Sequence, residues 1–361
     1  MAGLHALVAF LLSFLLVAAS TPLIRRCALQ WKLGDKPNGR KIHTSTIPHL
    51  GGIGMVIGSL GSLGLLIAFY SGVNGEVPRI LLKVLVPVGM IVTLGLTDDT
   101  KNLRAHQKLT VQTIASFIIA VSGIHLLVGL PAFDSHLLFV ILLTAFYLVG
   151  VSSSVNLIDG HDGLAAGIVF ISACAFGVTG LVLESAALVC VSLTVAGACL
   201  GFLIYNFPPG RIFMGDTGSL FLGIMLGILA CSFTMLQPNI NTFFGVCLIL
   251  SVPMLDSWLA IARRLTLRRP VFEADCMHIH HVLGTFGFSP RQTLVILYSM
   301  QAVLAALGIL AVMGFVFPIV TGLGILLVAF STFYRMMVAS KMRLGERPSE
   351  FPRGSVPSLE K

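Results

Sequence analysis

The sequence predicts an all-α polytopic membrane protein with about 11 transmembrane helices, its N-terminus outside and its C-terminus cytoplasmic. Composition, the length of the apolar runs and the distribution of basic residues all support this fold class. Hydrophobic residues make up 56% of the 361 residues and charged residues only 11%, whereas soluble domains carry about 25% charged residues. Because a soluble chain of this size needs a polar surface, lipid is the environment that fits this composition.

Apolar runs long enough to cross a bilayer, which takes roughly 20 residues, recur along the whole chain. We predict spans near 2–24, 50–70, 79–97, 109–129, 136–154, 163–181, 184–206, 217–235, 240–262, 292–314 and 316–337. The first run lacks a preceding basic segment, so we expect a retained helix rather than a cleaved signal peptide. Residues 1–337 then form a single integral-membrane domain, and 338–361 form a polar cytoplasmic tail.

Basic residues lie almost entirely on one side of these spans. Of the 23 Lys and Arg, only Arg79 and Lys83 fall on the other side, so the positive-inside rule makes the basic side cytoplasmic. The predicted cytoplasmic loops are 25–49, 98–108, 155–162, 207–216 and 263–291. The net charge of +8 therefore reflects topology and attraction to membrane lipids, and we expect no nucleic-acid partner because no basic stripe with interleaved aromatic residues occurs. The seven cysteines form no CxxC pair, so neither a disulfide framework nor a zinc site is predicted.

Eight of the nine aspartates lie in or next to the predicted cytoplasmic loops, and several lie at span ends, where an unpaired charge costs a few kcal/mol. Four motifs contain the polar residues of interest. They are LGLTDDTKNL with Asp98, Asp99 and, further on, Lys108; VNLIDGHDGLAAG with Asn156, Asp159 and Asp162; RIFMGDTGSLFLG with Phe213 and Asp216; and the loop 263–291 with His278, His280 and His281.

Each motif also has a structural interpretation. The Asp98–Asp99 pair could be a solvated helix end, although acid at a helix C-terminus opposes the macrodipole. Lys108 could be a topology anchor, Asp216 a helix N-cap and Phe213 an interfacial packing residue. The histidines could bind a transition metal, but neither a cysteine partner nor an HExxH helix accompanies them.

Taken together, the four motifs indicate one site facing the cytosol. Carboxylates and an amide suit a hard divalent cation, and Lys, Arg and His suit phosphates. Mg²⁺ prefers oxygen ligands and substrate phosphates over a cage made entirely of protein groups. The expected substrates are therefore a soluble phosphorylated donor and a lipid acceptor.

The motifs LTDDTKNL with HQKL, VNLIDGHDGLAAG, FMGDTGSLFLG and ADCMHIHH resemble those of the polyprenyl-phosphate N-acetylhexosamine-1-phosphate transferases. Their order and spacing match along nearly the whole chain, from DKPNGRKIH (35–43) to FSPRQT (288–293). The span number and the HIHH motif resemble the bacterial undecaprenyl-phosphate N-acetylglucosamine-1-phosphate transferase branch.

This resemblance implies an enzyme that transfers a sugar 1-phosphate, best matched by N-acetylglucosamine 1-phosphate, from a UDP-N-acetylhexosamine to undecaprenyl phosphate. UMP is released, and the product is the first membrane intermediate of a cell-surface polysaccharide. The resemblance also implies Mg²⁺ as cofactor, with Mn²⁺ as an alternative. It further implies a bacterial plasma (inner) membrane location with a cytoplasmic active site, and it is compatible with a homodimer.

The resemblance also implies a role for each motif residue. The catalytic residues would be Asp98, Asp99 and Asp159. The metal and pyrophosphate would lie at Asp216 and Asn156. The substrates would contact Lys108 through phosphate, Phe213 through uracil stacking, Asp162 near the nucleoside, and His278, His280 and His281 at the sugar or its phosphate.

Two questions stay open at this level. Relatives often carry Arg where this chain has Cys276, which puts the identity of the donor sugar in question, and Arg268 and Arg269 are candidate substitutes. Asp98 could position the acceptor, tune the metal site or act as a covalent nucleophile. A phosphomonoester acceptor with a second pKa of about 6 is largely dianionic at neutral pH, so a general base has little proton to remove.

Other functions fit less well. A transporter or lipid flippase would need ionisable residues at mid-membrane and broken-helix repeats, and no repeat is visible. A structural scaffold gives no reason for four polar clusters on one side. Within the enzyme class, the alternative is the same chemistry on another UDP-amino sugar, such as a fucosamine, quinovosamine or muramoyl-pentapeptide derivative.

Overall fold

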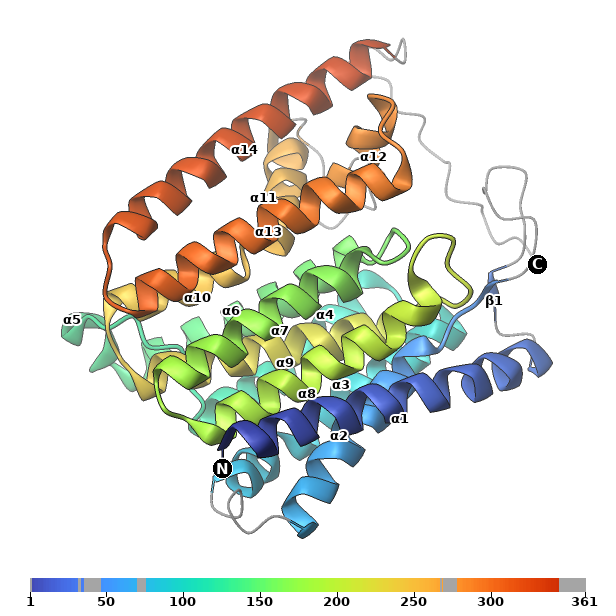
Figure 1. Ribbon diagram of the computed structural model, residues 1–361. Coiled ribbons are helices and arrows are strands. Elements are labelled where there is room, and N and C mark those ends of the chain that lie inside the picture. Colours follow the sequence, from blue (N-terminus) through green and yellow to red (C-terminus); the bar gives the residue numbers. More distant parts are fainter. Residues whose placement is uncertain are drawn as a thin grey trace.

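The computed structural model describes residues 2–31, 34–35, 47–69, 76–266, 268 and 278–343. Its helices run side by side in a bundle, with α5 at one end and β1 at the other (Figure 1). The helices are α1 (Ala2–Gln30), α2 (Gly51–Phe69), α3 (Glu76–Lys101), α4 (Ala105–Val121), α5 (Pro131–Asp134), α6 (Leu137–Ile158), α7 (Leu164–Val182), α8 (Ala186–Asn206), α9 (Gly215–Leu236), α10 (Ile240–Ile249), α11 (Ser251–Thr266), α12 (Ile279–Thr285), α13 (Pro290–Val312) and α14 (Phe317–Arg343). The two-residue strands β1 (Gly34–Asp35) and β2 (Ile47–Pro48) pair antiparallel.

The predicted all-α polytopic membrane fold is confirmed in the described residues, whereas the number of 11 spans and the orientation stay predictions. Eight helices in the described ranges are long and apolar enough to cross a membrane, or nine if the bent pair α10 and α11 counts as one span. Each of the 11 predicted spans corresponds to a helix or to this pair. Helix α4, with 17 residues, is the shortest of the helices that match a predicted span singly.

Several observed helices end at other residues than the predicted spans. Helices α3, α6 and α14 extend past the predicted ends to Lys101, Ile158 and Arg343, so parts of the predicted loops 98–108 and 155–162 and of the predicted tail are helical. Helix α1 continues past residue 24 to Gln30, so Arg25 and Arg26 are helical rather than part of a loop. Helix α4 ends at Val121 rather than near 129, because Gly123 adopts a φ of +88°, a left-handed conformation that ends a helix. The predicted span 240–262 is broken, and its halves α10 and α11 meet at a bend of 78°.

The apolar residues after α4 form a loop at the end of the bundle that carries α5. Thr144 and Thr234 accept hydrogen bonds from the backbone N–H groups of residues 126 and 127, which replaces the helical bonds that are lost. Asp134 accepts three more, from residues 128 to 130, at 2.8–3.1 Å. Asp134 therefore stabilises this loop, at the end of the bundle opposite the other aspartates described below.

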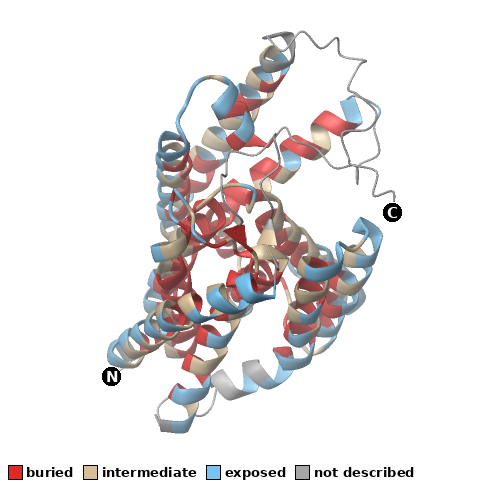
Figure 2. Ribbon diagram, turned by 90° about the vertical axis from the view of Figure 1, so that its right-hand side faces the viewer, coloured by how far each residue is buried: buried red, intermediate tan, exposed pale blue. Residues whose placement is uncertain are grey.

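Helix α9 lies at the centre of the bundle and packs against α2, α3 and α6. Buried residues concentrate in the middle of the molecule, whereas exposed residues line its outer faces (Figure 2). Many of these exposed residues are large and apolar, among them Phe146 at 73% exposure and Leu327 at 72%. An outer surface of this kind is stable in lipid, which agrees with the span assignment.

Two glycines let neighbouring helices approach the first turn of α9. A Cβ added to Gly52 of α2 would lie 2.1 Å from the backbone nitrogen of Gly218, and one added to Gly95 of α3 would lie 2.4 Å from the Cα of Thr217. Because no side chain separates these backbones, the C-terminal turn of α3 comes directly beside the N-terminus of α9. This contact brings the first and third polar motifs together.

Candidate active site

Asp98, Lys108 and Asp216 form an ion-paired cluster. The Nζ atom of Lys108, in the first turn of α4, lies 2.5 Å from Oδ2 of Asp98 and 2.6 Å from Oδ2 of Asp216. The other Asp98 oxygen accepts a hydrogen bond from the Leu103 N–H at 2.7 Å. Residues from three separate segments thus share one ammonium group at the end of the bundle.

The environment of this cluster shifts the ionisation of its members. Burial and the neighbouring Asp216 carboxylate raise the pKa of Asp98, which lies beyond the predicted span 79–97, to about 6, although Lys108 acts in the opposite direction. Burial alone would lower the pKa of Lys108, but the charges and hydrogen bonds of Asp216 and Asp98 raise it overall. Lys108 therefore stays protonated and can neutralise anionic groups.

Asp99 caps the N-terminus of α9 from another helix. Its carboxylate accepts hydrogen bonds from the Asp216 N–H at 2.7 Å, the Thr217 N–H at 3.1 Å and the Thr217 hydroxyl at 2.6 Å. Gly215 approaches closely because it has no side chain, since a Cβ there would lie 2.7 Å from both Asp99 oxygens. Asp99 thus fixes the turn that carries Asp216. It also accepts hydrogen bonds from N–H groups in the first turn of α9, which have no carbonyl acceptor within the helix.

Asn156 lies in the last turn of α6, and Asp159 directly follows that helix. The Asn156 amide lies beside Asp216 and donates a hydrogen bond to the Ser219 hydroxyl at 2.9 Å. Among the described residues, no side chain pairs with the Asp159 carboxylate. Burial raises its pKa well above the ordinary value, and the charges of Asp216, Asp99 and Asp162 raise it further. The end of α6 therefore contributes an amide and an unpaired acid to the cluster.

Asp162 holds the loop between α8 and α9. Its Oδ2 accepts a hydrogen bond from the Gly210 N–H at 2.8 Å. The same loop carries Phe213, whose ring centroid lies 5.5 Å from that of His49 at an interplanar angle of 35°. The Phe213 N–H also donates to the Pro48 carbonyl, and the Phe213 carbonyl accepts from the Gly51 N–H. Asp162 and Phe213 are thus brought to the same loop, but their side chains belong to separate contacts.

The histidine motif contacts the α6–α7 loop at Gly160. Asp256 of α11 accepts hydrogen bonds from His278 Nδ1 at 2.7 Å and from the Ile279 N–H at 2.8 Å. A Cβ on Gly160 would lie 3.1 Å from Nε2 of His280, so the α6–α7 loop and α12 are in close contact. Burial, with His281 nearby, lowers the pKa of His280 to about 3, so this imidazole is neutral at physiological pH. His281 is exposed.

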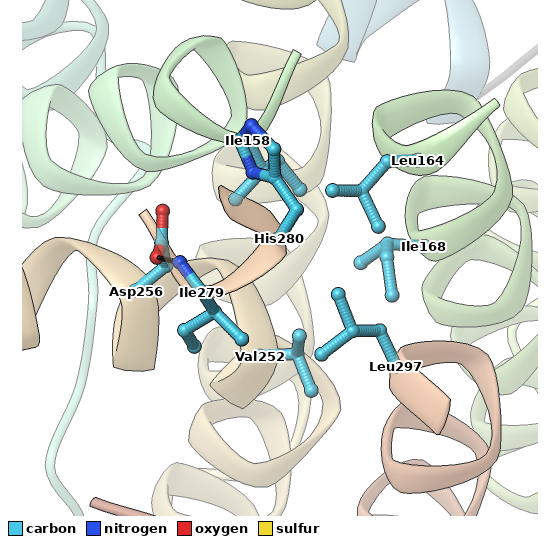
Figure 3. A pocket seen from close by; sticks show the side chains of 8 residues that line it. All are labelled: Ile158, Leu164, Ile168, Val252, Asp256, Ile279, His280 and Leu297. Carbon is cyan, nitrogen blue, oxygen red and sulfur yellow. Dashed lines mark hydrogen bonds between the residues drawn. The ribbon is translucent and has the colours of Figure 1, made fainter. Parts of the chain in front are cut away.

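The carboxylate–imidazole contact fixes the proton on Nδ1 of His278 and leaves its Nε2 for another partner. Figure 3 shows Asp256, Ile279 and His280 on the wall of a small cavity that is otherwise apolar. Asp256 is the participant that the sequence motifs do not single out. Its position inside the predicted span 240–262 was the available signal, because an ionisable residue within a span is functional by default.

The structure thus gathers all four polar motifs at one end of the bundle. Lys108, Asp98, Asp216 and Asn156 form one cluster, Asp159 links it to the α6–α7 loop, and the histidines lie against that loop. Cys276 and Arg269 lie outside the described residues. Arg268 is exposed and follows the end of α11.

The cluster offers oxygen donors of the kind that a hard divalent cation takes together with substrate phosphates. Four carboxylates, those of Asp98, Asp99, Asp159 and Asp216, lie close enough to influence one another, and Lys108 is the basic side chain that pairs with them in the described ranges. In the same ranges, no group of three or more His, Cys, Asp or Glu residues forms a ready-made metal site. Mg²⁺ is usually bound by one or two carboxylates and substrate phosphates rather than by a closed protein cage, so this arrangement of the described residues is compatible with that ion.

Comparison with known proteins identifies the family of this chain. Residues 81–234 match the model of glycosyl transferase family 4. The chain is 35% identical over 297 residues to a protein of Bacillus subtilis named as a probable undecaprenyl-phosphate N-acetylglucosaminyl 1-phosphate transferase, covering 81% of this chain and 80% of that relative. It is 34% identical over 298 residues to a decaprenyl-phosphate N-acetylglucosaminephosphotransferase of Mycobacterium tuberculosis, covering 74% and 73%.

A third relative is a phospho-N-acetylmuramoyl-pentapeptide-transferase of Desulforudis audaxviator, 32% identical over 333 residues, with 85% of this chain and 97% of that relative covered. The membrane-spanning helices and these matches together define a class, the multi-pass membrane phosphosugar transferases. Within this class, the chain belongs to glycosyl transferase family 4.

Proposed function

We propose that this enzyme transfers N-acetylglucosamine 1-phosphate from UDP-N-acetylglucosamine to undecaprenyl phosphate and releases UMP, at the cytoplasmic face of the bacterial inner membrane. The observation that carries this proposal is the ammonium of Lys108 between Asp98 and Asp216, at the end of the bundle where all four polar motifs meet. The names of the Bacillus and Mycobacterium relatives support N-acetylglucosamine as the sugar.

The chemical problem is electrostatic, because an anionic lipid phosphate must approach an anionic diphosphate. Neutralising charge placed in advance lowers the barrier of such a transfer. Asp216, with the Asn156 amide beside it, would hold Mg²⁺, which when bound neutralises charge on the donor diphosphate. Lys108 already lies beside Asp216 and would bind a phosphate oxygen.

The contacts of Asp98 support a positioning role over a nucleophilic one. One of its oxygens accepts from the Leu103 N–H, and the other pairs with Lys108, so neither is free for attack in this arrangement. The acceptor phosphate is largely dianionic at neutral pH and needs little help from a base. Asp98 therefore orients Lys108 toward the acceptor phosphate, and Asp99 acts through the turn that carries Asp216.

The donor would bind between the α8–α9 loop and the histidine motif. Phe213 offers a ring face for uracil, and Asp162 anchors the loop that carries it. The free Nε2 of His278 and the exposed His281 offer hydrogen bonds to the sugar or its phosphate. His280 is neutral and buried, so it packs α12 against the α6–α7 loop.

The test uses purified protein with Mg²⁺, undecaprenyl phosphate and radiolabelled UDP-N-acetylglucosamine. Label should enter the organic-extractable fraction while UMP appears in the aqueous one, and both should vanish with EDTA or in Asp216→Ala. Glu184→Gln, which changes an exposed carboxylate between α7 and α8, is the matched control and should keep full turnover. Well-folded protein that makes neither product from this donor would contradict the proposal.

The Desulforudis relative supports a second donor, UDP-N-acetylmuramoyl-pentapeptide, because the match covers nearly all of that protein. A panel of UDP-amino sugars under the same conditions separates the two. Turnover with the pentapeptide donor alone would favour the second candidate.

A further inference from the structure

The bend between α10 and α11 lies deep in the bundle. Ten residues of α10 at about 1.5 Å per residue span roughly 15 Å, about half the hydrocarbon thickness. Pro253 has no N–H, so it cannot donate to the carbonyl of Ile249, four residues earlier. A helix can break at this depth only where neighbouring groups satisfy the freed backbone atoms.

Gln301 of α13 supplies this compensation for both halves of the break. Its Nε2 donates to the Ile249 carbonyl at 2.6 Å, and its Oε1 accepts from the Val252 N–H at 3.3 Å. Ser172 of α7 completes the network, donating to the same carbonyl at 2.9 Å and accepting from Gln301 Nε2 at 3.0 Å. Both side chains are fully buried. A single amide therefore joins the last residue of α10 to the first turn of α11.

The direction of α11 decides where the histidines lie. Asp256 follows Val252 by about one helical turn and holds His278 and the start of α12. Val252 and Asp256 surround one cavity together with Ile279, His280 and residues of α6, α7 and α13 (Figure 3). A change in the angle at the bend would therefore move Asp256 and, with it, the histidine motif relative to Gly160 and Asp159.

We propose that Gln301 is a positioning residue for the transfer reaction. With Ser172 it holds the 78° bend, so that Asp256 places the His278–His281 segment against the α6–α7 loop. The catalytic consequence rests on the proposed function, whereas the effect on the direction of α11 does not.

The experiment reads the position of α11 directly. Trp258 lies on α11 with 55% exposure, and the chain has two tryptophans, so Trp31→Phe leaves Trp258 as the single reporter. In vesicles containing lipids brominated at known depths, the quenching profile of Trp258 reports its depth. Gln301→Leu keeps a similar volume but removes the bridge. We expect its Trp258 profile to shift and kcat to fall about 10- to 100-fold, with a smaller change in KM.

Two variants control for general destabilisation. Leu304→Ala removes a fully buried side chain from the same helix, α13, and should leave the Trp258 profile and kcat close to those of the parent. Gln301→Glu should restore the parent profile and most of kcat, because a carboxyl group protonated in this apolar site has one donor and one acceptor. Should Gln301→Leu fail to fold, Ser172→Ala, which removes one donor to Ile249, should give a smaller shift in the same direction.

An unchanged Trp258 profile in folded Gln301→Leu protein would overturn the proposal, as would an equal loss of kcat in Leu304→Ala. If Gln301→Leu shifts the Trp258 profile but the parent protein turns over no UDP-sugar, the proposed function is contradicted and the positioning of α11 by Gln301 still stands.

Discussion

Asp98 and Asp99 are adjacent in sequence but stabilise different parts of the site. Neighbouring positions of a helix point about 100° apart, so their side chains meet different partners. Asp98 faces Lys108, whereas Asp99 faces the N-terminus of α9. A pair of acids that looks like one motif therefore has one member paired with a cation and another that acts as a helix cap.

Replacing Asp99 should lower the stability of the protein as well as its rate of turnover. Asp99→Ala removes the acceptor of three hydrogen bonds, so we expect a loss of about 0.5–2 kcal/mol in unfolding free energy, the range measured for helix caps. Thr217→Val removes one of these bonds and should have a smaller effect. Denaturation in detergent measures both, and an unaltered transition in Asp99→Ala would show that the cap is dispensable.

Lys108 lies between Asp98 and Asp216, so its ammonium group would repel a divalent cation bound at Asp216. In Lys108→Met the carboxylates lose their cation, so we expect Mn²⁺ to bind the substrate-free protein about tenfold more tightly. Turnover should nevertheless fall by about 10²- to 10³-fold, because a cationic phosphate contact is lost. Mn²⁺ titration followed by electron paramagnetic resonance gives the affinity, and weaker binding in the variant would contradict competition between ion and lysine.

At the scale of elements, the approach of α3 to α9 decides whether the site forms. Gly95 allows this approach, and an added methyl group would meet the backbone of Asp216 and Thr217 rather than a side chain that could move away. Gly89 lies on the same helix with open space around it. These two glycines therefore give a matched pair of substitutions.

We expect Gly95→Ala to destabilise the protein by about 1–3 kcal/mol through overpacking and to abolish most turnover, because Asp98 and Asp99 are displaced from α9. Gly89→Ala should retain turnover and gain up to about 1 kcal/mol, since alanine favours a helix. Unfolding curves and product formation measured on both variants test this. Comparable turnover in the two would mean that the close approach is not needed.

At the scale of the whole molecule, the residues at the two ends of the bundle define its orientation in the membrane. Lys101 is exposed at the end with the candidate active site, and Ser135 is exposed at the end with α5. The distribution of basic residues predicts that the active-site end faces the cytoplasm.

Single cysteines at these positions, in a cysteine-free background, test this orientation. We expect Lys101→Cys to react with a membrane-impermeant maleimide only in inside-out vesicles, and Ser135→Cys only in right-side-out vesicles. The reverse pattern would place the candidate active site outside the cell.

The sequence by itself determined the fold class, the position of nearly every span and the membership of the four motifs. These properties are local, because the length of an apolar run and the placement of lysines and arginines depend on neighbouring residues and on the bilayer. It also indicated which residue types would serve as phosphate and cation ligands, since carboxylates, amides and ammonium groups keep that chemistry wherever they lie.

Only the tertiary structure decided which motif residue meets which partner. Asp99 with Thr217 and Asp256 with His278 join positions far apart in the chain, and their pairing depends on how the helices pack. The break after Ile249 depends equally on Gln301 and Ser172 from other helices, because Pro253 weakens the helix but does not by itself set a 78° bend. Periodicity in one segment carries no information about hydrogen-bond partners in another, and a buried backbone group is stable only where such a partner exists.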